Sequence, residues 1–391
     1  MDYPAPVLPP LLVLVSILAQ DGCSKCDHLG VLPCTAHRDV GEDAPSAENP
    51  VLFCSFAGAC AACGGALWID CPRCEGGPRT AEITARRAAV AAWMQLDALE
   101  TAMGRAVPRL ETRRFALVVD VAELPDGTKP GGTKKVQGHA LAHRLAQDVE
   151  HVAGRIAAHY AIEDKDYRAK MRMWIWPALE PHQKATETFL GTLARGDFKV
   201  LGRDPVLSVW TEPVLFDDVT KVRTLFAHNA AHMLLSNAFE PVWVGGDGNG
   251  GWFDAGLAHW YEYELFGRTA NYCIEEATLL QNWENGVWRA ALRRRLEKEQ
   301  GPLLPGVFQK RTGAMTQPEH ALCWSFYDYL VAEHSAALRP LLIELKKKRP
   351  ARELLAKHLG LDLPTAEAAW RVWVSATYPL KGDEPRPAKK K

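Results

Sequence analysis

Cysteines crowd into one stretch near the start of the chain, where eight of the ten lie between residues 23 and 74. One spacing occurs there twice. Cys23-Ser-Lys-Cys26 is followed after seven residues by Cys34-Thr-Ala-His37, and Cys60-Ala-Ala-Cys63 is followed after seven by Cys71-Pro-Arg-Cys74. Two copies of C-x2-C-x7-C-x2-(C or H) are hard to obtain by chance, so this segment has to fold around them.

The spacing predicts structural zinc. A C-x2-C turn directs both sulfurs into one concavity, and two such turns complete the tetrahedral shell that zinc prefers. We expect each copy to hold one ion, and so two Zn²⁺ in all. The first site would use Cys23, Cys26, Cys34 and His37, with His28 as a substitute for His37, and the second would use Cys60, Cys63, Cys71 and Cys74.

Two alternatives stay open for these cysteines. An exported protein could use them in disulfide bonds, although repeated C-x2-C pairs favour metal. Cys54 has no place in either shell and is a free thiol, or a ligand if the grouping differs. The segment resembles the C-x-x-C zinc modules of the J-domain chaperones and related zinc ribbons. A closed four-ligand site leaves no position for substrate, so we expect it to scaffold or bind.

The ends and the charge of the chain bear on location and partners. Residues 11–19, LLVLVSILA, resemble the apolar part of a secretory signal, but no Lys or Arg precedes them. We expect export, periplasmic or extracellular, with a buried segment in a cytoplasmic protein as the alternative. The stretch is too short to span a membrane. A net charge of −1 over 391 residues gives no global field for nucleic acid, and the basic end at 386–391 fits a solvated tail.

The middle of the chain alternates strand and helix signals. Valine- and tryptophan-rich runs at 115–121, 171–176 and 206–210 predict strands, and residues 80–99 and 141–156 have helical character. Further helices are expected at 275–299, 319–334, 338–348 and 366–377. The fold class is therefore α+β, with a small mixed sheet and a helical C-terminal half. We divide the chain into an apolar segment (1–20), a zinc module (21–78), an α+β domain (79–270), a helical subdomain (271–379) and a basic tail (380–391).

One predicted helix carries a histidine pair. Residues 226–235, FAHNAAHMLL, place His228 and His232 four residues apart, so both imidazoles project from one face and can share a metal ion. The chemistry of H-E-x-x-H also needs its glutamate, which takes a proton from metal-bound water. Here that position is Asn229, whose amide cannot do so.

The next segment, Trp252 to Glu262, reads WFDAGLAHWYE. Together with the histidine pair it resembles the gluzincins, the thermolysin-like and bacterial peptidase MA-like metallopeptidases, in which W-L-x-E-G-x-A-x-Y follows H-E-x-x-H. The resemblance covers roughly residues 110 to 378 and implies a zincin-like domain. In that family the glutamate of the second motif is the third zinc ligand, and here its position is Ala255.

Two functions are compatible with the replacement of the family's two glutamates by Asn229 and Ala255. The first is a catalytically inactive gluzincin-like protein that binds a peptide or protein, with zinc in the cysteine module alone. The second is a metal-dependent hydrolase with an atypical site, in which Asp254 or His259 joins His228 and His232. Catalytic Zn²⁺ is doubtful in the first case and required in the second. Glu262 is a further candidate base, but we expect it to lie too far from the site.

Overall fold

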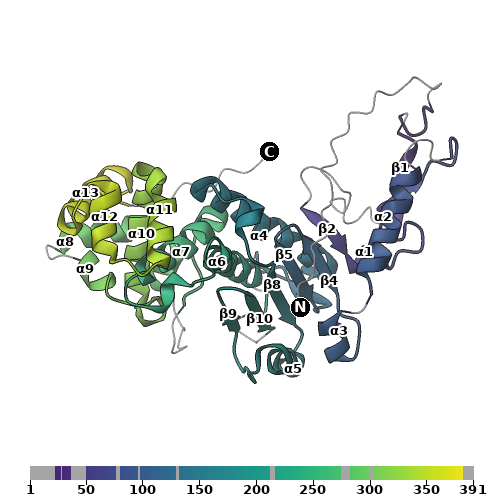
Figure 1. The fold of residues 1–391 in the computed structure, drawn as a ribbon, viewed down its shortest axis with the longest axis horizontal. Helices are drawn as coiled ribbons and strands as arrows, with labels where there is room; N and C mark the ends of the chain where they lie inside the picture. The colour runs from purple at the N-terminus through teal and green to yellow at the C-terminus, as the bar shows by residue number, and fades with distance from the viewer. Residues whose placement is uncertain are drawn as a thin grey trace.

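The protein is described by a computed structural model that covers residues 23–27, 29–36, 50–75, 80–95, 97–128, 132–211, 216–273, 282–299 and 303–381. Three parts follow one another along the molecule (Figure 1). The cysteine-rich part lies at one end, a β-sheet flanked by helices occupies the middle, and a bundle of helices forms the other end.

A six-stranded mixed sheet organises the middle part, with strand order β2-β4-β5-β8-β10-β9. Its three central strands are parallel, and the outer strands pair antiparallel to their neighbours. The strands predicted near residues 115, 171 and 206 are confirmed as the three central ones. The bounds are β2 (Val51–Cys54), β4 (Arg109–Thr112), β5 (Phe115–Val119), β8 (Met171–Trp176), β9 (Phe198–Val200) and β10 (Val206–Trp210).

Side chains alternate between the two faces of this sheet, as strand geometry requires. Leu117 and Met173 belong to the main core, which α4 (Gly138–Tyr160) and α6 (Val219–Asn237) cover. Their neighbours Val118 and Trp174 point the other way, into a smaller core beneath α3 (Ala98–Met103) and α5 (Leu179–Leu190). Because α6 lies inside the molecule, nearly all of its residues are buried, His228 and His232 among them.

The helical end packs onto α6 through α7 (Gly251–Phe266), which in turn packs against α10 (Gln317–Glu333). The helices predicted near 319–334, 338–348 and 366–377 are present. The helix expected over 275–299 is wrong for residues 282–288, because Glu284 and Asn285 take left-handed backbone angles that no α-helix accepts. The remaining bounds are α8 (Arg289–Lys298), α9 (Leu304–Val307), α11 (Leu338–Lys346), α12 (Ala351–Leu359) and α13 (Leu363–Thr377).

The cysteine-rich part has little apolar core of its own. Val31, Ala66 and Ile83 form its buried cluster among the described residues. So few buried side chains supply little stabilisation, and small modules of this kind depend on metal ions or other cross-links. Its elements are β1 (Val31–Pro33), β3 (Trp68–Asp70), α1 (Ser55–Gly58) and α2 (Thr80–Trp93), while β2 belongs to the main sheet. The helix expected over 80–99 ends at Trp93.

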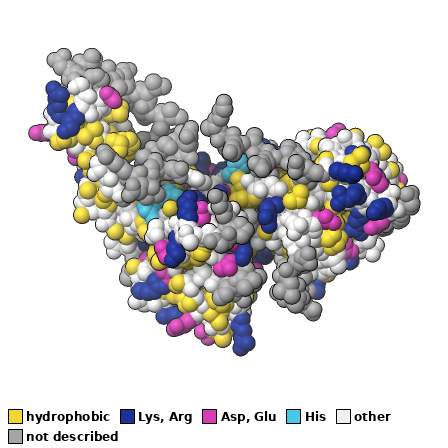
Figure 2. All heavy atoms as spheres, turned by 180° about the vertical axis from the view of Figure 1, so that it is seen from behind, with side chains coloured by type: hydrophobic (Ala, Val, Ile, Leu, Met, Phe, Trp, Pro, Cys, Tyr) yellow, Lys and Arg dark blue, Asp and Glu magenta, His cyan; other side chains and the backbone are white. Residues whose placement is uncertain are grey.

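Several predictions fall on residues outside the described ones: the apolar segment at 11–19, His28, His37 and the basic tail. Within the described helices, none is long and apolar enough to cross a membrane. Basic and acidic side chains are interspersed on the face shown in Figure 2. The overall architecture combines helices and strands, and the predicted small mixed sheet and helical C-terminal half are both present.

Candidate metal centres

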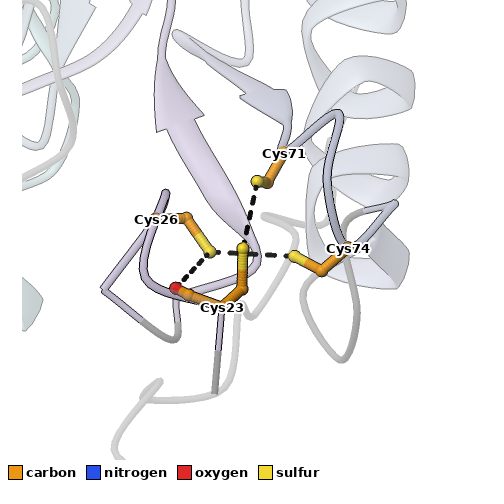
Figure 3. Close-up of side chains that lie close together, drawn as sticks. All are labelled: Cys23, Cys26, Cys71 and Cys74. Atoms are coloured by element: carbon orange, nitrogen blue, oxygen red, sulfur yellow. Dashed lines mark hydrogen bonds between the residues drawn. The ribbon is translucent and has the colours of Figure 1, made fainter. Parts of the chain in front are cut away.

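The first metal centre candidate unites four thiols. Cys23 and Cys26 face Cys71 and Cys74, and all four sulfurs point toward one another (Figure 3). The Sγ atoms of Cys23 and Cys71 are 3.8 Å apart, and those of Cys26 and Cys74 are 3.7 Å apart. Two sulfurs bound to one tetrahedral zinc are separated by about 3.8 Å, whereas a disulfide needs about 2.05 Å. The spacing fits a zinc ion and does not fit a disulfide.

A second group contains Cys34, Cys60 and Cys63. The sulfurs of Cys34 and Cys60 are 3.9 Å apart, and Cys34 and Cys63 are buried. The backbone amide of Cys34 donates to the carbonyl of Leu67 and fixes its turn. Three thiols leave one position of a tetrahedral shell, and the predicted ligand His37 lies outside the described residues.

The grouping of these ligands differs from the expected one. Each repeat was expected to build its own site, but Cys26 of the first repeat meets Cys74 of the second, and Cys34 meets Cys60. The cause is the antiparallel pairing of β1 with β3. This pairing places the residues before β1 beside those after β3, and the residues after β1 beside those before β3. Ligands from the two repeats are therefore interleaved.

The third candidate metal centre is built on α6. The Nε2 atoms of His228 and His232 are 3.2 Å apart. Cys273 approaches the same point, with its Sγ 3.5 Å from Nε2 of His228 and 3.1 Å from Nε2 of His232. Around a tetrahedral zinc we calculate about 3.4 Å between nitrogens and about 3.6 Å between sulfur and nitrogen. Two imidazoles and one thiol thus converge with nearly the geometry of a three-ligand zinc site.

Two buried carboxylates of α7 orient the imidazoles. The Nδ1 atom of His232 is 2.9 Å from Oδ1 of Asp254, and that of His228 is 3.0 Å from Oε2 of Glu262. A neutral imidazole that donates from Nδ1 presents the lone pair of Nε2 to a metal. Burial lowers the pKa of His228, but its hydrogen bonds with Cys273 and Glu262 outweigh this effect and raise the pKa to about 9.

Neither expected additional ligand, Asp254 or His259, joins both His228 and His232 in one group of possible ligands; His259 instead groups with His228 and Glu262, with one ligand atom of each within 4.8 Å of the others. Asp254 accepts from the Nδ1 side of His232 and also from Trp243 and Thr312, so it supports a ligand instead of being one. His259 pairs through Nε2 with Nδ1 of His320, at 2.9 Å. Glu262, which we expected to lie too far away, reaches His228 directly.

Cys273 went unnoticed in the sequence because it stands alone, 41 residues after His232, with no spacing signal. Its thiol is acidic. Burial raises the pKa, yet the positive charges of His232 and Lys199 outweigh burial and hold the pKa of Cys273 well below its usual range. A thiolate is the form that binds metal. The third protein ligand of this centre is therefore best assigned to Cys273.

Asn229 follows His228 directly, at the position of the glutamate in an H-E-x-x-H motif, and both ends of its amide are engaged. Its Oδ1 accepts from Nζ of Lys199 at 2.9 Å, and its Nδ2 donates to the carbonyl of Leu225 at 2.9 Å. Lys199 also lies 3.1 Å from the sulfur of Cys273. Burial lowers the pKa of Lys199, but Cys273 outweighs it and the pKa is raised. Lys199 is thus a cation that cannot accept a proton.

The remaining residues singled out in the segment from Trp252 to Glu262 on α7 pack into the core. Ala255 is buried and carries no ligand atom. A Cβ on Gly256 would lie 2.6 Å from the carbonyl oxygen of Cys323, so glycine is needed for the close approach of α7 to α10. Trp252 stacks on Phe308 with ring centroids 4.2 Å apart.

No protein-family model matches the chain, and no curated protein shows significant similarity to it. Function has to be inferred from the chemistry of the three centres.

Proposed function

We propose that this chain is a gluzincin-like protein that binds zinc through His228, His232 and Cys273, binds an extended peptide or protein segment, and does not hydrolyse it. Two further zinc ions in the cysteine-rich part are structural. The carrying observation is the position of Asn229, whose amide is held between the Lys199 ammonium and the Leu225 carbonyl where hydrolysis needs a proton acceptor.

Retention of metal is supported by the charges around the ligands. Once both imidazoles have lost their extra protons, as metal binding requires, the Cys273 thiolate and the carboxylates of Asp254 and Glu262 carry three negative charges, whereas Lys199 supplies one positive charge. A divalent cation offsets the remainder. Zinc at this point would supply Lewis acidity, while the side chains of the protein fix its coordination. This differs from the first of the two functions expected from the sequence, in which only the cysteine module held zinc.

Loss of hydrolysis follows from where the acids and bases lie. The carboxylates of Asp254 and Glu262 are occupied on the Nδ1 side of the imidazoles, away from the Nε2 atoms that would face the metal. A general base must reach the metal-bound water within hydrogen-bond distance. The polar groups near Cys273 are instead the ammonium of Lys199 and the side-chain amide of Asn229, and neither can act as a base.

Peptide binding is supported by the edge of the sheet. β9 is the last strand in the sheet order, so among the described strands it pairs on one side only, with β10. An extended peptide can add to such an edge through main-chain hydrogen bonds. Lys199, the middle residue of β9, reaches Asn229 and Cys273. A segment bound along β9 would therefore run beside the metal centre.

The second candidate is a metal-dependent hydrolase with an atypical site. It is favoured by the two carboxylate–imidazole pairs, His232 with Asp254 and His228 with Glu262, because orientation of this kind also serves catalytic zinc. In this case Asp254 and Glu262 act as supporting groups, and water activation requires a base from elsewhere.

Zinc counting and peptidase assays on the full chain test the proposal. We expect stoichiometric zinc, no cleavage of casein or of fluorogenic unstructured peptides, and loss of one zinc per chain on replacing His228 and His232 together with alanine. The matched control is His151→Ala, which changes a histidine that pairs with Glu264 away from the centre. Cleavage that disappears with the histidine pair would establish the hydrolase, and an unchanged zinc count would refute metal binding here.

A further inference from the structure

A second histidine pair lies at the start of α4. His139 and His143 are four residues apart on the helix, and Cys54, the last residue of β2, lies against them. The sulfur of Cys54 is 3.6 Å from Nε2 of His139. One ligand atom from each of the three residues falls within 4.8 Å of the others. Neither the cysteine module nor the centre on α6 uses these residues.

The arrangement repeats the chemistry of the centre on α6, with a helical histidine pair and a cysteine from another element. We calculate about 3.6 Å between sulfur and nitrogen around a tetrahedral zinc, which is the separation found between Cys54 and His139. Hydrogen bonds with both histidines favour the thiolate: burial raises the pKa of Cys54, but the histidines outweigh it and lower the pKa to about 7.

Neighbouring residues hold the pair in place before any ion binds. The backbone amide of Gly138 donates to the carbonyl of Ala122 at 2.7 Å, and a Cβ on Gly138 would lie 2.0 Å from the carbonyl oxygen of Val121. Glycine is thus required for the first turn of α4 to approach this loop. The ring of His139 stacks on Phe56 at 4.7 Å, which limits its rotation. Such preorganisation reduces the entropy lost when a metal binds.

One side of the cluster opens to solvent. Cys54 and His143 are buried, whereas His139 is half-buried and lines a hollow of about 530 Å³. A three-ligand zinc keeps a fourth position for water or a small ligand. The hollow provides space for that ligand, and its lining includes Phe56, Pro108, Asp120, Gln137, His139 and Pro177.

We propose that Cys54, His139 and His143 form a further zinc site whose remaining coordination position faces this hollow. The ion joins β2, which lies within the cysteine-rich stretch of sequence, to α4 of the α/β part. This proposal does not depend on the function proposed for His228 and His232, because the two sites share no residue.

The test is zinc counting on the full chain after dialysis, with two variants and one control. Cys54→Ala and the double variant His139→Ala with His143→Ala should each hold one zinc fewer per chain than the wild type. His151→Ala, two turns further along α4, should hold the wild-type number. An unchanged count in both test variants would overturn the proposal, whatever the His228 and His232 variants show.

Alkylation provides a second readout that does not require a variant to fold. In the zinc-loaded wild type, iodoacetamide should label Cys54 at least tenfold more slowly than in the same protein after zinc removal, as read by peptide mass spectrometry. Equal labelling of Cys54 in both states would show that no zinc protects this thiol and would overturn the metal site.

Discussion

Glu262 links two ligands of the centre on α6, so its replacement by glutamine should weaken zinc binding without altering the packing. One carboxylate oxygen accepts from His228 at 3.0 Å. The other accepts from the backbone amide of Ala270 at 2.6 Å and from Nδ2 of Asn271 at 2.8 Å, just ahead of Cys273. Glu262 therefore orients one ligand and anchors the segment that carries another.

The expected loss of zinc affinity follows from the tautomer that His228 must adopt. A glutamine oxygen can keep the two bonds to Ala270 and Asn271, but its amide then presents hydrogens to Nδ1 of His228. That nitrogen must become an acceptor, and the proton moves to Nε2, the atom that should bind zinc. Loss of such a supporting carboxylate typically costs 10- to 100-fold in metal affinity, or about 1.4–2.7 kcal/mol.

The assay is a zinc competition titration of the full chain against a chromophoric chelator, with circular dichroism to verify folding. The control is Glu264→Gln on the same helix, because Glu264 pairs with His151 and is partly exposed. A Glu262→Gln affinity within twofold of the wild type, or an equal loss in the control, would refute the role of Glu262.

Three other predictions concern the cysteine module, the core and the response to pH. Replacing Cys26 and Cys74 together with serine should remove one zinc, since both belong to one site; loss of two ions by elemental analysis would favour separate sites for the two repeats. Gly256→Ala should lower the free energy of unfolding by about 1–3 kcal/mol in urea titrations, because its Cβ overpacks α7 against α10; an unchanged value would contradict this. Burial holds the pKa of His159 at about 4, against about 6.5 unfolded. As the pH falls, the unfolded chain therefore binds this proton before the folded protein does, and the free energy of unfolding drops between pH 6.5 and 4. His159→Gln should reduce that drop by about 1–2 kcal/mol, a value discounted because the group is partly exposed. Identical drops in both proteins would contradict this prediction.

The strands and helices that sequence predicted share strong local patterns. The runs at 115–119, 171–176 and 206–210 are rich in valine, leucine and tryptophan, and they became the buried central strands. Short outer strands such as β4 and β9 escaped notice because three or four residues carry too little alternation to distinguish a strand from a loop. The break at 282–288 depends on left-handed backbone at Glu284, Asn285 and Gly286, and the Asn285-Gly286 turn signal was overlooked within the helical pattern.

For the candidate metal sites, too, the sequence does not show which distant residues come together. The spacing of the cysteines singled out residues that do cluster, but their grouping depends on the antiparallel direction of β1 and β3, which spacing does not encode. Cys273 joins His228 and His232 only through tertiary folding. His139 and His143 stood at the same four-residue spacing and went unrecognised, since no family motif surrounds them.

Anomalous diffraction at the zinc edge from crystals of the full chain tests the central claim most directly. We predict a peak about 2.0–2.3 Å from Nε2 of His228, Nε2 of His232 and Sγ of Cys273, in addition to the peaks at the cysteine module. Peaks at the cysteine module with none between His228, His232 and Cys273 would contradict a retained metal centre.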